Sequence, residues 1–247
     1  MTMKWALLSD IHSNLTALQR VLSEIEQYRV DGIVCLGDIV GYGAHPDECV
    51  AEVQRCATLC VRGNHDAGAL GEINIDYFSG RARQAIIWTQ DKLSPASRAY
   101  LAECPLRETH ENLLLVHGSP RDPIWEYILD RQTAYINFQE SEAQLCLFGH
   151  SHIPSLFSWS GSEVGGLRAV GDQTQRLEAG ERYLINPGSV GQPRDGDPRA
   201  SFGLLTLDEN GGQIEWHRVT YDIERTRQEI RQAGLPSELG DRLLSGV

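Results

Sequence analysis

The stretch KWALLSDIHSN, residues 4–14, places an apolar run directly before two side chains that commonly bind metal ions. Trp5 to Leu8 has the length and composition of a buried strand. Side chains two positions apart in an extended segment point the same way, so Asp10 and His12 can face one cavity. Behind them, residues 14–27 repeat leucine and isoleucine at helical spacing. The stretch therefore predicts a strand, a polar turn and a helix, which together open an α/β fold.

The same arrangement recurs four more times along the chain. The later apolar runs are residues 32–36, 59–61, 113–116 and 145–148, and they are followed by GD (37–38), GNHD (63–66), HG (117–118) and GHSH (149–152). Loops at the carboxyl ends of the strands in an α/β sheet gather on one edge, so segments far apart in the sequence can converge there. Glycine beside the candidate ligands permits tight turns. We therefore expect one polar site where five loops meet.

Seven side chains of these segments are candidate metal ligands. They are Asp10, His12, Asp38, Asn64, His117, His150 and His152. Carboxylate, amide and imidazole donors of this mixed kind suit Mn, Fe, Co, Ni and Zn alike, so the sequence does not identify the metal. The inventory fits two divalent ions that share a bridging carboxylate. One further histidine, His65, is left for proton chemistry.

Taken singly, most of these segments have an ordinary structural explanation. Asp10 can cap the helix that begins near Asn14, and Gly37-Asp38 is a common turn. An Asn-His turn without function would also account for residues 63–66. Five such segments in one chain, each behind an apolar strand, are hard to explain by coincidence. The series therefore favours metal binding.

The remaining sequence predicts one domain, residues 1–247, with a helical insertion at about 67–107. Helices are expected around 46–53, 82–92, 95–104 and 222–233, and strands at 156–159, 183–185, 202–207 and 214–220. The later strands indicate a second, mostly antiparallel sheet after His152. Residues 161–180 are polar and contain glycine, which predicts a mobile loop or exposed hairpin. Trp88 and Trp125 are interpreted as packing residues of helices.

Composition limits the partners that the chain can have. A formal net charge of −12 disfavours an extended nucleic-acid surface and binding to anionic membranes. Two bound dications can still create a local positive patch, which leaves a small phosphorylated substrate possible. No apolar stretch approaches the ~20 residues that cross a bilayer, and no signal peptide precedes the first motif. The six cysteines form no CxxC pair, so a reducing cytoplasm is expected. The oligomeric state stays open.

The series of motifs resembles the signature of the calcineurin-like metallophosphoesterase superfamily, which is D-x-H, GD, GNH[D/E], H and GHxH. The resemblance spans residues 4 to about 220, and every metal-ligand position is filled. It is closest to the small prokaryotic phosphodiesterases of the superfamily, because of DIHSN (10–14) and NPGSV (186–190). The resemblance implies a layered α/β fold in which two mixed β-sheets pack as a sandwich flanked by helices.

The resemblance also implies how the ligands divide between the two ions. It places Asp10, His12, Asp38 and His152 on one ion, and Asp38, Asn64, His117 and His150 on the other. Asp38 would then bridge the pair, and His65 would act as the proton donor.

Two positions depart from the pattern of the Ser/Thr protein phosphatases in this superfamily. Tyr42 stands where those enzymes carry a phosphate-binding arginine, and Gly41 stands where an aspartate orients the histidine acid. Both departures weaken a protein-phosphatase assignment. Asp66 is then the expected partner of His65.

Two polar residues are candidates for substrate binding. Arg194, in the segment QPRDGD (192–197), can supply the missing guanidinium to a phosphate, although a solvated turn explains this segment equally well. Asn14 can donate to a substrate phosphate, and it is also a good N-cap for the first helix.

The sequence thus predicts a metal-dependent phosphoesterase acting on a phosphodiester or nucleotide-type substrate. Direct attack by a metal-bridging hydroxide is expected, with His65 protonating the leaving alkoxide. One alternative is a phosphomonoesterase or nucleotidase, which differs only in how the pocket receives the leaving group. Another is a non-catalytic scaffold that keeps the metal site for stability or for binding a partner protein.

Overall fold

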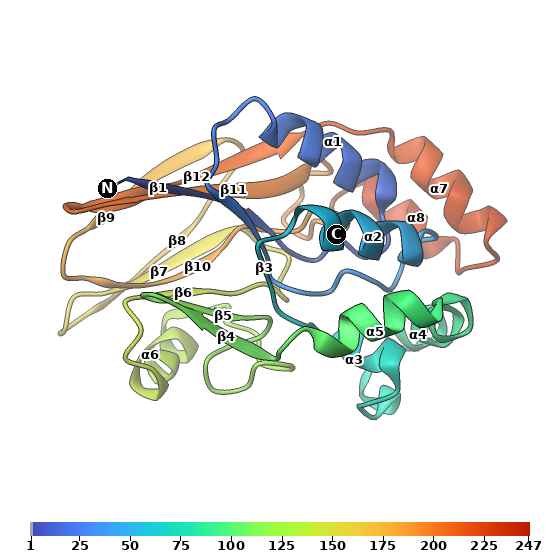
Figure 1. Cartoon of the computed structure of the whole chain (residues 1–247), viewed down its shortest axis with the longest axis horizontal. Coiled ribbons are helices and arrows are strands. Elements are labelled where there is room, and N and C mark those ends of the chain that lie inside the picture. Colours follow the sequence, from blue (N-terminus) through green and yellow to red (C-terminus); the bar gives the residue numbers. More distant parts are fainter. Residues whose placement is uncertain (1) are drawn as a thin grey trace.

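The computed structural model describes residues 2–247 as two mixed β-sheets with helices on their outer faces (Figure 1). The first sheet has the strand order β3-β2-β1-β11-β12-β9. Its strands are β1 (Met3–Leu8), β2 (Gly32–Cys35), β3 (Leu59–Cys60), β9 (Gln173–Glu178), β11 (Ala200–Asp208) and β12 (Gly211–Val219). β1, β2 and β3 are parallel, whereas β11, β12 and β9 continue the sheet in antiparallel pairs.

The second sheet has the order β4-β5-β6-β10-β7-β8. Its strands are β4 (Arg107–His110), β5 (Leu113–Val116), β6 (Leu145–Leu147), β7 (Ser155–Trp159), β8 (Val164–Arg168) and β10 (Arg182–Asn186). β5, β6 and β10 are parallel, and the outer pairs are antiparallel. The two mixed sheets and their layered packing confirm the predicted fold class.

Helices cover the outer faces and one end of the sandwich (Figure 1). They are α1 (Leu15–Ile25), α2 (Pro46–Cys56), α3 (Asn64–Leu70), α4 (Gly80–Lys92), α5 (Pro95–Glu103), α6 (Arg131–Glu140), α7 (Ile223–Gln232) and α8 (Glu238–Asp241), with 3₁₀ turns at Ile75–Tyr77 and Arg242–Leu244. α1 and α2 pack on the first sheet, and α6 packs on the second. No described helix combines the length and apolar character needed to span a bilayer.

Alternation along the strands separates the interior core from the helix-facing cores. Leu7 of β1 and Leu205 of β11 belong to the apolar cluster between the two sheets, where Trp216 is also buried. Ala6 and Leu8 point to the opposite face and pack with α1 and α2. Successive side chains of a strand face opposite sides, so both faces of these central strands must be apolar.

The order of strands differs from the sequence-based expectation in one respect. The strands after residue 152 do not form a separate sheet, because β11 pairs with β1 and β10 pairs with β6. Residues 161–180 are not a hairpin either. They hold β8, which pairs with β7 in the second sheet, and β9, which pairs with β12 in the first. Alternation identifies a strand, but its partner is a non-local choice that a single sequence does not reveal.

The core between the sheets provides a test of the fold. Leu205→Ala should lower the free energy of unfolding by about 2–5 kcal/mol, because the fully buried side chain leaves a cavity between two sheets. The same substitution at Leu129, which is 44% exposed, should cost less than about 1 kcal/mol. Urea unfolding measures both. Equal destabilisation by the two variants would contradict this description of the core.

Candidate metal centre

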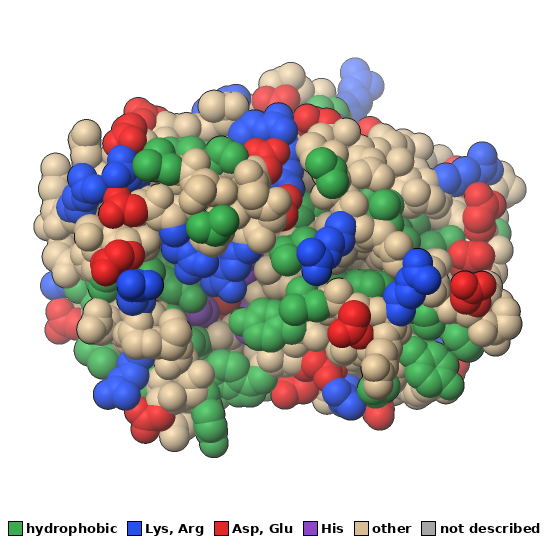
Figure 2. All heavy atoms as spheres, turned by 180° about the vertical axis from the view of Figure 1, so that it is seen from behind, with side chains coloured by type: hydrophobic (Ala, Val, Ile, Leu, Met, Phe, Trp, Pro, Cys, Tyr) green, Lys and Arg blue, Asp and Glu red, His purple; other side chains and the backbone are tan. Residues whose placement is uncertain are grey.

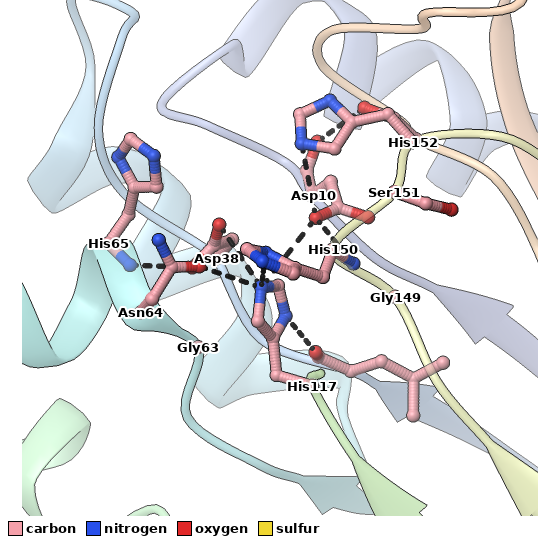
Figure 3. A network of polar contacts seen from close by, with 12 residues as sticks. Asp10, Asp38, Gly63, Asn64, His65, His117, Gly149, His150, Ser151 and His152 are labelled. Carbon is pink, nitrogen blue, oxygen red and sulfur yellow. Dashed lines mark hydrogen bonds and ion pairs between the residues drawn. The ribbon is translucent and has the colours of Figure 1, made fainter. Parts of the chain in front are cut away.

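The loops that follow strands of both sheets bring the sequence motifs together. Asp10 and His12 follow β1, and Asp38 follows β2. Asn64 and His65 form the first turn of α3, just after β3. The remaining ligand candidates, His117, His150 and His152, follow β5 and β6. The five segments converge as expected (Figure 3), but they come from two facing sheets and not from one sheet edge.

Backbone conformations in these loops are unusual for residues other than glycine. The φ angles are positive at Asp10 (53°), His12 (52°), Asp38 (53°), His150 (63°) and His152 (59°). Each left-handed residue of this kind costs about 1–2 kcal/mol. Such strain persists only where the surroundings hold it, and it is concentrated at functional sites. Here it occurs at five of the seven candidate metal ligands.

The candidate ligands form two groups that share one carboxylate. Donor atoms of Asp10, His12, Asp38 and His152 lie within 4.8 Å of one another, and so do those of Asp38, His117 and His150. All of these residues are buried. Asn64 Oδ1 lies 3.0 Å from His117 Nε2, beside the second group. The structure thus brings together all seven candidates, with Asp38 common to both groups.

Backbone carbonyls fix the orientation of the four imidazole rings. His12 Nδ1 donates to Val40 O at 3.2 Å, and His152 Nδ1 donates to Gln192 O at 2.6 Å. Leu36 O and Trp125 O accept in the same way from His117 Nδ1 and His150 Nε2, at 2.8 and 3.2 Å. A carbonyl oxygen only accepts, so each contacting nitrogen carries the proton. The other ring nitrogen therefore presents a lone pair to the centre, as metal-binding histidines do.

The inward-facing atoms fit divalent cations. His12 Nε2 lies 3.1 Å from His152 Nε2, and His117 Nε2 lies 3.2 Å from His150 Nδ1, so lone pairs face each other. One buried carboxylate oxygen of Asp10 and one of Asp38, Oδ2 in each case, has no hydrogen-bond partner. Buried polar atoms without partners are rare and require an explanation. Cations bound between these donors would satisfy all of them.

Electrostatics within the protein also favour positive charge at this place. Burial raises the pKa of Asp10 to about 7, and burial lowers the pKa of His150 to about 3. Burial also lowers the pKa of His117, but the negative charges of Asp38 and Asp10, the close contact with the Asp38 carboxylate and the hydrogen bond to Leu36 O together outweigh burial and raise this pKa to about 9. A bound cation would take the place of that proton and would stabilise both carboxylates in their charged form.

His65 and Asp66 do not interact in the expected way. Asp66 accepts hydrogen bonds from Val40 N at 3.0 Å and Gly63 N at 2.9 Å, so it holds the loops together. His65 Nδ1 is buried without a partner and faces Gly41, where an added Cβ would approach it to 2.4 Å. The prediction that Asp66 orients His65 is therefore wrong. The carboxylate instead bonds two backbone amides, one at the N-cap of α3 and one in the loop after β2.

The two candidate substrate-binding residues have different surroundings. Asn14 caps α1 by accepting from Ala17 N at 3.1 Å and donates to Gly191 O at 2.9 Å, so its amide is engaged in structural contacts. Its predicted contact with substrate phosphate has no support here. Arg194 lines the cavity above the candidate ligands and donates to Gln192 Oε1 at 2.9 Å and to the Tyr42 hydroxyl at 3.4 Å. Its guanidinium thus lies beside Tyr42, which stands where the Ser/Thr protein phosphatases carry a phosphate-binding arginine.

Residues that the sequence analysis did not assign to the site complete the cavity, which has a volume of about 330 Å³. They are Tyr77, Phe78, Trp125, Tyr127 and Arg242. Trp125 is in a loop after β5 and contacts Phe78 with ring centroids 4.9 Å apart, so its interpretation as a helix-packing residue is wrong. Trp88 does pack, since its Nε1 donates to Ala233 O. Trp125 and Tyr127 lie in the loop that follows the His117 motif, and this position in the sequence was the signal that could have placed them at the site.

Comparisons with known proteins agree with this geometry. A family profile described as a calcineurin-like phosphoesterase superfamily domain matches residues 3–210. An uncharacterized protein of Methanocaldococcus jannaschii is 41% identical over 98% of this chain and 97% of its own. The crystal structure of a metallophosphoesterase from Sphaerobacter thermophilus is 41% identical, covers 100% of both chains and has a TM-score of 0.88.

A more distant relative has a named activity. Phosphodiesterase YfcE of Escherichia coli K12 is 27% identical over 83% of this chain and 89% of its own. The family match covers most of the chain, and it spans all seven candidate ligands, six of which form the buried Asp/His cluster. The protein therefore belongs to the calcineurin-like phosphoesterase superfamily, a family of metal-dependent hydrolases.

Proposed function

We propose that this protein is a phosphoesterase with two divalent metal ions and that it hydrolyses a phosphodiester or nucleotide-type substrate. The observation that supports it most directly is that Asp38 belongs to both ligand groups, at the base of a cavity that His65 and Arg194 also line. The mixed N/O donors suit Mn, Fe, Zn, Co or Ni. The six cysteines are free in the structure, which supports the inferred reducing cytoplasm.

The metal ions, when bound, would supply an activated water nucleophile and neutralise charge at the phosphorus. One ion would be held by Asp10, His12, Asp38 and His152. The other ion would be held by Asp38, Asn64, His117 and His150. The carbonyls that accept from the outer ring nitrogens hold these imidazoles in one orientation, with the other ring nitrogen turned to the centre. Because the four rings are already oriented, little reorganisation is needed for binding.

Arg194 and His65 would act on the phosphate and on the leaving group. No carboxylate of residues 2–247 pairs with Arg194 at salt-bridge distance, so its guanidinium is available to phosphate oxygens. Nδ1 of His65 faces Gly41, which leaves Nε2 as the ring nitrogen that can reach into the cavity. From there Nε2 can donate a hydrogen bond or a proton to the oxygen of the departing alcohol.

Four aromatic residues that line the cavity, here called the aromatic rim, support a substrate with a flat group. They are Tyr77, Phe78, Trp125 and Tyr127. Tyr77 is 76% exposed and contacts Trp125 edge to face, with 5.9 Å between ring centroids. Tyr127 stacks on His150 at 3.9 Å. Exposed aromatic rings of this kind stack on nucleobases or aryl groups. A phosphomonoesterase or nucleotidase would use the same centre, and a non-catalytic scaffold would need neither His65 nor the rim.

A turnover assay would separate these three functions. Bis-p-nitrophenyl phosphate, p-nitrophenyl phosphate and a panel of nucleotides would be tested, each with Mn, Fe, Co, Ni or Zn. Preferential cleavage of diesters or nucleotides supports the proposal, and exclusive cleavage of the monoester supports the first alternative. Absence of turnover with every cation, in protein shown to contain metal, would leave the scaffold.

Asp38→Asn tests the shared carboxylate. Removal of the one charge that belongs to both ligand groups should lower metal content at both positions, as measured by elemental analysis. Asp91→Asn makes the same chemical change at an exposed position and should leave metal content unaltered. Two ions per chain in Asp38→Asn would show that this carboxylate is not the bridge.

His65→Ala tests the proton donor. The variant should keep both ions but lose turnover on the order of 10²–10⁴-fold, because no other histidine takes over donation to the leaving group. The loss should be smaller for nitrophenyl esters than for alkyl esters, since nitrophenolate leaves without protonation. His110→Ala, outside the cavity, serves as the control. An equal loss for both ester types would contradict the role of an acid.

Tyr77→Ala tests the aromatic rim. Loss of a stacking surface should weaken inhibition by AMP by about tenfold or more while inhibition by inorganic phosphate stays within twofold. Inhibition constants measured against bis-p-nitrophenyl phosphate give both values. Tyr135→Ala, at an exposed position on α6, is the matched control. Parallel changes for AMP and phosphate would mean that the ring does not contact the base.

A further inference from the structure

A second cavity adjoins the one at the metal centre. It has a volume of about 750 Å³ and lies between the start of α4 and the C-terminal segment. Tyr42, Ser79 and Arg242 line both cavities, so the two spaces meet at these side chains. Figure 2 shows Lys and Arg side chains gathered beside a hollow in which histidine side chains are visible. A ligand at the metal centre can therefore extend into the second space.

Arginine side chains give this junction its charge. Arg242 is half-buried, and its pKa is lowered by burial and by the nearby positive charges of Arg194 and Arg81. Its Nε donates to the backbone oxygen of Val247. Within residues 2–247 no Asp or Glu side chain forms an ion pair with Arg242, and its two terminal guanidinium nitrogens donate no hydrogen bond to an acidic side chain.

The acids that line the second cavity are already paired with other arginines. Glu238 lies 3.5 Å from Arg81, and Asp241 lies 2.6 Å from Arg227 and 2.9 Å from Arg231. Arg242 therefore has no acidic side chain as a counter-ion, although the whole chain carries a net charge of −12.

The start of α4 adds to the positive potential. Ser79 is the N-cap of this 13-residue helix, but its side chain makes no capping hydrogen bond, and the first turn has no acidic residue. Its hydroxyl and the amides behind it are thus free to meet an anion that Arg242 holds. Guanidinium groups bind phosphate oxygens with strong, charge-assisted hydrogen bonds.

We propose that the substrate carries a second phosphate group besides the scissile one, and that Arg242 binds it at the junction of the two cavities. This inference rests on the proposed function. With the aromatic rim, the arrangement fits an ester of a nucleoside bisphosphate. Arg242 lies outside residues 3–210, which the family profile matches, so this subsite comes from the chain's own C-terminal segment.

A matched pair of esters tests the subsite. The p-nitrophenyl ester of thymidine 5′-phosphate and the same ester carrying a 3′-phosphate differ only in the second phosphate. The wild-type protein should show a higher kcat/KM for the 3′-phosphorylated ester. Arg242→Gln, which keeps most of the side-chain length, should reduce the ratio of the two kcat/KM values on the order of 10- to 100-fold. Arg242→Lys should reduce it less, because the charge remains but the planar fork is lost.

Arg225→Gln provides the control. This exposed arginine lies on α7, pairs with Glu229 and is outside both cavities, so the ratio should not change. Thermal melting of all variants confirms that they fold. An unchanged ratio in folded Arg242→Gln, or no preference for the 3′-phosphorylated ester in the wild-type protein, overturns the inference.

Binding calorimetry gives a readout that does not depend on turnover. Adenosine 3′,5′-bisphosphate should bind the metal-loaded protein more tightly than AMP, and Arg242→Gln should remove this advantage. If no ester is cleaved but the advantage and its loss are observed, the subsite stands and the proposed function fails. If esters are cleaved and the bisphosphate has no advantage, the proposed function stands and the subsite is refuted.

Discussion

Burial of two carboxylates among four imidazole rings is the constraint on which the surrounding loops depend. Asp38 Oδ2 lies 3.3 Å from His117 Nε2 and 3.6 Å from His12 Nε2, and it has no hydrogen-bond partner. Removing charged groups from water is unfavourable unless opposite charge or hydrogen bonds replace the water. The left-handed backbone of these loops points the donors inward at a further cost. Bound cations would offset both costs. The conformation of the loops therefore depends on the same donor atoms that would bind the metal ions.

Much of this could be predicted from the sequence, because it depends on local patterns. The strand before each motif, the seven ligand candidates and the helices of residues 80–103 follow from spacing and residue type. Asp38 in both ligand groups also agrees with the resemblance. The predictions that failed concern contacts between residues far apart in the sequence. β11 joins β1 and β8 separates from β9 because sheet partners are chosen across the fold, where periodicity carries no information.

The errors at the site have the same origin. Asp66 looked like a partner for His65 because it is the next residue, yet side chains adjacent in a helix point apart and the carboxylate meets two backbone amides. Asn14 was predicted to bind substrate phosphate, but its side chain caps α1 and donates a hydrogen bond to the loop at Gly191. Arg242 escaped notice because it follows the last motif by many residues. Tertiary contacts, which the sequence does not show, determine where these three side chains lie. Motif spacing, in contrast, was enough to identify the metal-ligand candidates.

The pairing of β1 with β11 has a consequence for biosynthesis. Met3 lies opposite Leu207, so β1 is synthesised long before β11, its antiparallel neighbour, exists. Until then the apolar edge of a parallel three-stranded sheet is open to other nascent chains, and such edges promote misassembly. The same long separation makes folding slow relative to a chain with local contacts. A chaperone that shields this edge during translation would raise the yield of native protein without touching its final stability.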